Sequence, residues 1–359
     1  MQTKVVDISS WERLIFNTEG TRDKLIVQSP EDGKVYYFKT SLKRARREYP
    51  LEFWSEVIAY RTAHLLGFDA LRYDVAYSKT DNASWLVGCI SPSMIKDGFY
   101  LHSGYNLICD YRPDFGENKN YKKEHTLPLI ISVLKHHGLL GCKHRFIECL
   151  VLDAIIGNTD RHSENWAMLS LSIYQDYKES EKELYNYIKK KSLVWQVLTN
   201  LYCLLRHKKT IKGMRKEATS KAMRLAPIYD SGSSLGREYT DLELQEMLEE
   251  KGREKFTRFI EKGYPDIQVE PTKRLTFLEC IRLLCIDHPE DMRQIYEQNL
   301  KNLSYKEINK MLQTVDQPAR GIIPEELCLS NIRKEFLYNL IYERTERIKS
   351  IIQKHVPLS

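Results

Sequence analysis

The stretch 155–169 constrains this chain more than any other. In it, an apolar helix end leads into a polar turn, and a second apolar run follows. The turn holds Asp160 and Asn165, five positions apart. A carboxylate can accept a proton from a hydroxyl group, and a side-chain amide can bind a metal ion as a neutral ligand. An ordinary Asx-rich turn between a helix and a strand has the same composition. The turn alone therefore leaves both a catalytic and a purely structural interpretation open.

A second acidic motif decides between these interpretations. A short apolar run leads into Asp230, which is followed by Ser and Gly. This Asp-Ser-Gly has the form of the Asp-Phe-Gly metal site of protein kinases, with a small residue in the middle. Asp160 and Asn165 also have the spacing of the kinase loop H-R-D-x-x-x-x-N, in which the Asp receives the substrate proton and the Asn binds Mg²⁺. Together the two motifs favour a phosphoryl-transfer site.

With these motifs the chain resembles the HipA-like serine/threonine kinases, including the CtkA-type branch, and more remotely the phosphoinositide kinases, which share an Asp-Arg-His-x-x-Asn loop. The resemblance implies an α+β, bilobal protein-kinase-like fold, with a small antiparallel β N-lobe carrying one helix and a large, mostly helical C-lobe. It also implies ATP and Mg²⁺ as cofactors, Asn165 and Asp230 as metal ligands, and Asp160 as the group that receives the hydroxyl proton. His162 matches the histidine of the phosphoinositide-kinase loop and is expected to stabilise the γ-phosphoryl group.

The N-terminal part predicts an ion pair. Strands are expected at 11–16, 24–28 and 35–40, in an antiparallel arrangement. Alternation along the third strand places Lys39 at the end of one face, where it could reach phosphates. The helix expected at 51–66 places Glu56 among small and aromatic residues, and a buried carboxylate needs a partner. Lys39 is the natural partner, as in the kinase Lys–Glu pair; Glu48 and Glu52 are rivals, and a lysine in solvent is the structural alternative.

The loop between the first two strands is a candidate phosphate loop. Gly20, Thr21, Arg22 and Lys24 offer backbone donors, a hydroxyl group and two cations, although the kinase G-x-G-x-x-G is missing. HipA-like proteins carry a short phosphate loop at this position, and the resemblance implies autophosphorylation there, at Thr18 or Thr21. A plain hairpin turn is the alternative. A further hairpin is expected at 73–79 and 84–90, followed by a hinge at 91–93.

The expected domains are an N-lobe at 1–92 and a helical C-lobe at 93–359. Within the C-lobe we expect the catalytic loop at 157–169, an inserted helical and basic segment at about 171–222, and the metal-site motif at 226–235. Further helices are predicted at 127–137, 144–156, 241–262, 276–287, 290–302, 305–315 and 331–355. Asp153 lies on the buried stripe of the helix at 144–156, where it either bonds a helix-end amide or braces the catalytic loop. The basic part of the insertion is either a docking surface for an acidic or RNA-associated protein substrate or a solvated face.

Composition limits the alternatives. With 359 residues, 42% of them hydrophobic, the chain can form one large or two modest cores. A net charge of +6 suits a polyphosphate ligand but falls short of a dedicated nucleic-acid binder. The eight Cys include no C-x-x-C pair, so we expect thiols in a reducing cytoplasm and no zinc motif. No apolar run reaches the roughly 18 residues of a membrane span, and no signal peptide is evident.

The leading hypothesis is therefore a cytoplasmic serine/threonine-protein kinase that binds ATP, Mg²⁺ and a protein substrate. A lipid or small-molecule kinase is the first alternative, and a pseudokinase that binds partners through its basic insertion is the second. The resemblance implies a bacterial toxin or effector, and secretion as an effector stays open. The chain starts close to its first expected strand, without room for the usual N-terminal subdomain of the family, which argues against a toxin complex.

Overall fold

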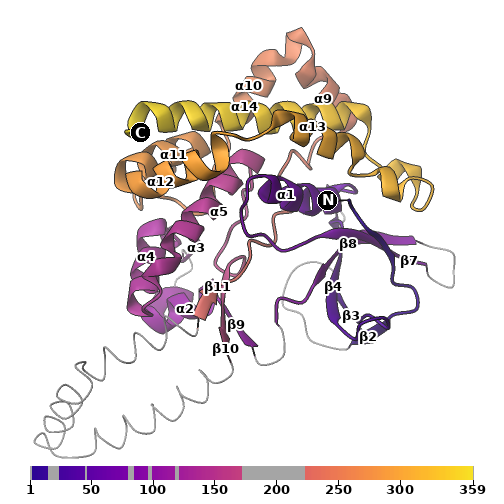
Figure 1. Cartoon of the computed structure of the whole chain (residues 1–359), viewed down its shortest axis with the longest axis horizontal. Coiled ribbons are helices and arrows are strands. Elements are labelled where there is room, and N and C mark those ends of the chain that lie inside the picture. The colour runs from indigo at the N-terminus through magenta and orange to yellow at the C-terminus, as the bar shows by residue number, and fades with distance from the viewer. Residues whose placement is uncertain are drawn as a thin grey trace, which may run out of the picture. The chain divides into compact units, whose positions relative to one another are not determined.

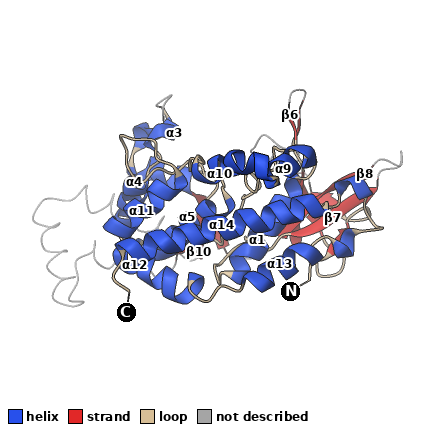
Figure 2. Cartoon of the chain, turned by 90° about the horizontal axis from the view of Figure 1, so that it is seen from above, coloured by secondary structure: helices blue, strands red, loops and turns tan. Residues whose placement is uncertain are grey.

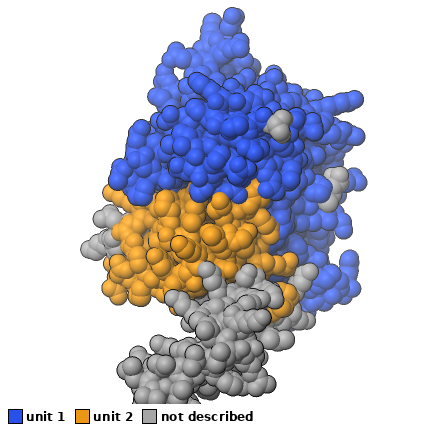
Figure 3. Space-filling view, turned by 60° about the vertical axis from the view of Figure 1, so that its left-hand side comes forward, with its two compact units in different colours: residues 1–94, 147–162, 227–359 blue, residues 95–146, 163–226 orange. Residues whose placement is uncertain are grey.

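The computed structural model describes residues 2–14, 24–44, 47–79, 85–95, 99–117, 121–171 and 223–358. Within them the chain forms two compact units, coloured separately in Figure 3. Unit 1 consists of residues 1–94, 147–162 and 227–359, and unit 2 of residues 95–146 and 163–226. The predicted insertion lies outside the described residues except at its first position. The lobe boundary expected after residue 92 stays a prediction.

Unit 1 begins with a six-stranded sheet in the order β1-β7-β8-β4-β3-β2 (Figure 1). Its strands are β1 (Val5–Asp7), β2 (Glu12–Leu14), β3 (Lys24–Gln28), β4 (Val35–Thr40), β7 (Asp74–Lys79) and β8 (Trp85–Pro92), and β5 (Lys43–Arg44) and β6 (Arg47–Glu48) form a separate small hairpin. The expected three-stranded start and the later hairpin are confirmed as β2–β4 and β7–β8. Strand β1 pairs with β7 in parallel, so the sheet is mixed. The three residues of β1 are too few to show an alternating pattern in the sequence, so the sequence does not predict this strand.

Helix α1 (Glu52–Leu65) packs against β7 and β8 and also against helix α13 (Tyr305–Thr314), as Figures 1 and 2 show. Residues 52–63 of α1 are all buried, so the helix has no solvent-facing stripe. Strand alternation places Phe38 and Lys39 on opposite faces of β4. Phe38 joins an apolar cluster that includes Val27 and Ile90, whereas Lys39 meets a carboxylate of α1. One face of the sheet thus holds this apolar cluster, and the other face carries Lys39 toward α1.

Helices fill the C-terminal part of unit 1, as the sequence predicts. They are α9 (Asp241–Leu248), η3 (Glu250–Gly252), α10 (Arg253–Glu261), α11 (Phe277–Asp287), α12 (Pro289–Ile295), η4 (Tyr296–Leu300), α13, η5 (Gln317–Ala319), η6 (Glu325–Leu327) and α14 (Asn331–His355). Ser330 caps α14 by accepting a hydrogen bond from the Arg333 amide. The single helix predicted at 241–262 is wrong, because α9 ends at Leu248, the backbone of Glu249 is extended, and α10 begins only after Gly252. A Cβ there would overlap the carbonyl oxygen of Glu246, so only glycine allows this close approach.

Unit 2 combines a small sheet with short helices. Its elements are β9 (Phe99–Ser103), α2 (Gly104–Tyr111), η1 (Pro113–Gly116), α3 (Tyr121–Glu124), α4 (Leu127–His136), η2 (Leu140–Cys142), β10 (Ala167–Leu171) and β11 (Met223–Leu225). The three strands pair antiparallel in the order β11-β10-β9. Helix α5 (Lys143–Ile156) starts in unit 2 and continues into unit 1 from Ile147. In the part of the chain that the structure describes, no helix is long and apolar enough to cross a bilayer.

Candidate active site

Three charged residues predicted from separate parts of the sequence meet in unit 1. The Lys39 ammonium lies 2.5 Å from Glu56 Oε1 and 2.5 Å from Asp230 Oδ1. Glu56 is 1% exposed and Lys39 is 8% exposed, whereas the Asp230 side chain keeps 24% of its surface accessible. Solvent therefore reaches this centre from the Asp230 side. The rival partner Glu52 forms its ion pair with Arg237 instead.

The Asp-Ser-Gly segment is fitted closely around Glu56. The Ser231 amide donates a hydrogen bond of 2.8 Å to Glu56 Oε2. A Cβ on Gly232 would lie 2.8 Å from Glu56 Oε1, so the glycine makes room for the carboxylate. Asp230 has φ = 54°, a left-handed conformation that aspartate tolerates better than most residues. The segment thus turns sharply at Asp230 and aims its carboxylate at Lys39.

Two further buried groups, Tyr73 and Cys89, lie close to this centre. The Asp230 amide donates to the Tyr73 hydroxyl oxygen at 3.4 Å. Burial, together with Glu56 and Asp230, raises the pKa of Tyr73 well above its ordinary value. Cys89 pairs with Lys39 in the β4–β8 ladder, and burial raises the pKa of its thiol. Both groups are therefore neutral at pH 7 and leave the charge of the centre to lysine and the carboxylates.

Lys24 lies on the same face as Lys39. The two lysines are directly opposite each other in the β3–β4 ladder, and such antiparallel partners point to the same side of a sheet. Two like charges in this position are unfavourable by themselves, and a bound polyphosphate would balance them. The other candidate phosphate-loop residues, Gly20, Thr21 and Arg22, lie outside the described residues.

A buried ion pair braces the predicted catalytic loop. Arg161 Nε and Nη2 donate to the two carboxylate oxygens of Asp153, at 2.9 and 2.8 Å. Both residues are 1% exposed, and the Asn158 side chain also donates to Asp153, at 2.9 Å. Burial would lower the pKa of Arg161, but Asp153 and other neighbours, including Asp230, together raise it. Asp153 thus bonds the loop itself rather than only a helix-end amide.

The same arginine reaches the metal-site motif. Arg161 Nη2 lies 3.0 Å from Ser231 Oγ, and Nη1 donates to the carbonyl oxygen of Tyr229. These two residues flank Asp230, so Arg161 connects the catalytic loop to both sides of the candidate metal ligand. Arg161 by itself gives no sign of this role in the sequence, because arginine at this position also fits a solvated turn. A signal was available in Asp153, a carboxylate on a buried stripe that requires a cationic partner.

Asp160 and His162 occupy the exposed side of this loop. Asp160 is exposed, and its Oδ2 accepts a hydrogen bond of 3.2 Å from Ser233 Oγ. The Thr159 amide donates to the Ser233 carbonyl oxygen, also at 3.2 Å. His162 is half-buried. An accessible carboxylate held next to the Asp-Ser-Gly segment has the chemistry that a general base requires.

Asn165 belongs to unit 2, where it is 6% exposed just before β10. Its amide oxygen and the Asp230 carboxylate are hard donors, the type that Mg²⁺ prefers. The lysines of the β3–β4 ladder are suited to phosphate oxygens. The residues present therefore fit a magnesium–nucleotide complex in their donor chemistry.

Comparison with models of known protein families finds no match, and comparison with curated protein sequences finds none either. Among solved structures, the chain is similar to the crystal structure of CtkA, a proinflammatory kinase from Helicobacter pylori. The TM-score is 0.67 and the sequence identity 16%, and the similarity covers 98% of this chain and 97% of that chain. This confirms the kinase-like α+β fold implied by the sequence motifs. The chain has the fold of the kinase CtkA over almost its whole length.

Proposed function

We propose that this chain is an ATP- and Mg²⁺-dependent kinase that transfers a phosphoryl group to a serine or threonine hydroxyl of a protein. The observation that supports this most is the buried Lys39 between Glu56 and Asp230. A purely structural ion pair has no need of a second carboxylate that remains partly exposed. An ammonium fixed by one carboxylate, next to another that solvent can reach, suits a site for a metal–phosphate complex.

Each residue has a distinct role in this proposal. Glu56 holds Lys39, which contacts the nucleotide phosphates, and Lys24 with the loop at Gly20, Thr21 and Arg22 covers them. Asp230 and Asn165 hold Mg²⁺. When bound, the ion neutralises charge on the β- and γ-phosphates.

Asp160 orients the substrate hydroxyl and receives its proton, and Ser233 fixes the rotation of the carboxylate. His162 faces the transferred group and stabilises its negative charge. In the absence of nucleotide, Lys39 balances the charge of Asp230. A Mg²⁺ ion held by Asp230 would balance this carboxylate instead, while Glu56 continues to hold Lys39.

Intact-mass spectrometry after incubation with Mg-ATP tests the proposal. We expect the wild-type chain to gain the mass of one or more phosphates and Asp160→Ala to gain none, because the variant lacks the proton acceptor. Peptide mapping should then locate the phosphate on Thr18 or Thr21. A wild-type chain that neither gains phosphate nor passes it to a panel of generic proteins would contradict the protein-kinase proposal.

A second arm separates the substrate classes. Labelled ATP is supplied together with generic acidic proteins or with phosphoinositide vesicles, and the labelled product is identified. Transfer to lipid alone would indicate the phosphoinositide-kinase alternative, and nucleotide binding without any transfer would indicate a pseudokinase. Both results would overturn the proposed protein substrate.

A further inference from the structure

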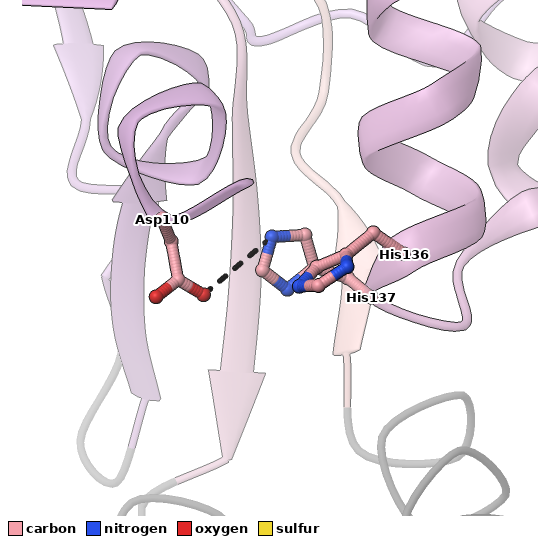
Figure 4. Close-up of side chains that lie close together, drawn as sticks. All are labelled: Asp110, His136 and His137. Atoms are coloured by element: carbon pink, nitrogen blue, oxygen red, sulfur yellow. Dashed lines mark ion pairs between the residues drawn. The ribbon is translucent and has the colours of Figure 1, made fainter. Parts of the chain in front are cut away.

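A cluster of metal-binding residue types lies in unit 2, in a part of the chain that the proposed phosphoryl transfer does not use. Figure 4 shows Asp110, His136 and His137, with the carboxylate and the two imidazole rings close together. One ligand atom from each residue lies within 4.8 Å of the others. Within this cluster, Asp110 Oδ2 is 3.8 Å from His137 Nε2. Three potential metal ligands therefore lie near one another.

The backbone around the cluster also favours a cation. Asp110 is in the last turn of α2, and His136 ends α4, so two helix C-termini meet the cluster. The aligned peptide dipoles give each helix C-terminus a partial negative charge. The Leu107 carbonyl oxygen, in α2, lies 3.3 Å from His137 Nε2 and accepts a hydrogen bond from this nitrogen when it is protonated, a contact that would be given up if the nitrogen bound a metal ion. Two helix ends and a carboxylate thus direct negative potential at the same place.

Burial divides the cluster into a fixed part and an adjustable part. The His137 side chain is 8% exposed, while the Asp110 side chain is 56% exposed and His136 is also exposed. Zinc ligands at about 2.0–2.1 Å in a tetrahedron lie roughly 3.3–3.5 Å apart. Rotation of the two exposed side chains toward His137 would close the remaining distance. His137 therefore positions the site, and the other two residues complete it.

We propose that Asp110, His136 and His137 bind a Zn²⁺ ion, with water in the fourth position. Two imidazole nitrogens and one carboxylate oxygen are typical zinc ligands, whereas Mg²⁺ and Ca²⁺ prefer oxygen ligands alone. The ion links the C-terminal ends of α2 and α4. This site is separate from the Mg²⁺ ligands proposed for phosphoryl transfer. The sequence does not reveal it, because its ligands come from two helices and lack the spacing of a zinc motif.

Zinc binding to the full-length chain without a histidine tag tests the proposal, by competition with a chromophoric chelator. We expect one Zn²⁺ per wild-type chain and an affinity lowered at least roughly tenfold in His136→Ala and in Asp110→Asn, because each variant loses a direct ligand. Both positions are exposed, so neither change should unfold the chain. The thermal unfolding temperature should rise with Zn²⁺ in the wild type and rise less in both variants.

Two controls make the result specific. His64→Ala removes an exposed histidine of α1, outside the cluster, and should bind Zn²⁺ as the wild type does. Asp230→Asn should also keep this affinity, which shows that the zinc is not held by the proposed active site. Equal zinc affinity in wild type, His136→Ala and Asp110→Asn would overturn the proposal. So would a thiolate charge-transfer band in the Co²⁺-loaded protein, because it would assign the metal to cysteine.

Discussion

The Lys39 ammonium faces two carboxylates at the same distance, so these three groups together carry a net charge of −1 when all are ionised. This balance suits a centre that will receive a divalent cation with its phosphates. It also makes the lysine important for stability, because its removal leaves Glu56 and Asp230 close together and uncompensated. The exposure of Asp230 allows water to screen part of that repulsion, whereas Glu56 has almost no contact with water.

Lys39→Met should abolish phosphoryl transfer and lower the free energy of unfolding by about 3–5 kcal/mol at pH 8, the usual cost of breaking a buried ion pair. Urea unfolding of the variant and of the wild type measures this loss.

Lys334→Met is the matched control for this variant. Lys334 is 4% exposed, and its ammonium lies 2.6 Å from the buried Asp316, outside the candidate site. We expect a similar loss of stability without a loss of phosphoryl transfer per folded molecule. If Lys334→Met lowered transfer as much as Lys39→Met, the contact of Lys39 with nucleotide would be disproved.

Among the elements, the segment 228–235 is held from several sides. Ile228 exchanges backbone hydrogen bonds with the linker between α1 and β7, and Ser231 bonds Glu56 of α1. Arg161 connects the segment to α5 through Asp153. The Leu235 amide donates to the Ile156 carbonyl oxygen at the end of α5. The candidate metal ligand Asp230 therefore has little freedom, which is the condition for a preorganised site.

Arg161→Met should lower stability by about 3–5 kcal/mol, because it strands the buried Asp153. It should also raise the Mg²⁺ concentration needed for activity, since the neighbours of Asp230 lose their donor. Asp153→Asn combined with Arg161→Met should cost less than the sum of the two single changes, by at least about 1 kcal/mol. Urea unfolding and a Mg²⁺ titration of activity measure both effects.

Arg333→Met separates stability from function in this test. Arg333 is also buried and bonds both a carboxylate, Asp241, and a backbone carbonyl, that of Tyr239. It lies on α14, and the hydrogen bonds that the structure describes for it do not involve Asp230. We expect Arg333→Met to lose stability and to keep the Mg²⁺ dependence of the wild type. A shift equal to that of Arg161→Met would mean that lower stability alone changes metal use.

Gly157 ends α5 with φ = 70°, at the start of the catalytic loop. A Cβ there would overlap the guanidinium of Arg344, which is held between Phe259 and Phe277 at 5.4 and 5.5 Å. Gly157→Ala should therefore cost more stability than backbone strain alone. Gly33→Ala is the matched control, because Gly33 has φ = 66° and open space around it.

We expect about 1 kcal/mol for Gly33→Ala from the left-handed backbone. Gly157→Ala should lose about 1–3 kcal/mol more, from the displaced side chain. Urea midpoints of the two variants provide the comparison. Equal losses would show that Arg344 moves aside without cost.

The sequence predicts those features that depend on local periodicity. Alternation along β4 and the faces of α1 are enough to expect Lys39 opposite Glu56, and the helix caps and hairpins follow in the same way. The contacts of Arg161 with Tyr229 and Ser231 join positions about 70 residues apart, which no local pattern can relate. The break between α9 and α10 is local, but it involves a close approach of Gly252 to the Glu246 carbonyl oxygen, which helical periodicity does not reveal.

At the scale of the whole molecule, the structure keeps the CtkA fold at 16% identity. Such conservation of fold is possible because a core requires apolar residues of suitable size at suitable positions rather than particular side chains. Positions that bind a metal ion or act as a base accept fewer substitutions than core positions do. The motifs around Asp160 and Asp230 are therefore a stronger argument for function than the fold itself.

Magnesium dependence is the property of the whole protein that follows most directly from these motifs. Asp230→Ala and Asn165→Ala each remove one proposed oxygen ligand, so each should raise the Mg²⁺ concentration for half-maximal phosphoryl transfer at least roughly tenfold. The thermal stabilisation by Mg-ADP should weaken in parallel, while stabilisation by ADP without metal should stay unchanged. Asp114→Ala is the control: it removes an exposed carboxylate that pairs with Arg112 at the surface. This variant should need the same Mg²⁺ concentration as the wild type. Wild-type Mg²⁺ dependence in Asp230→Ala would refute its assignment as a metal ligand, and the same result in Asn165→Ala would leave Asp230 to bind the ion without the amide.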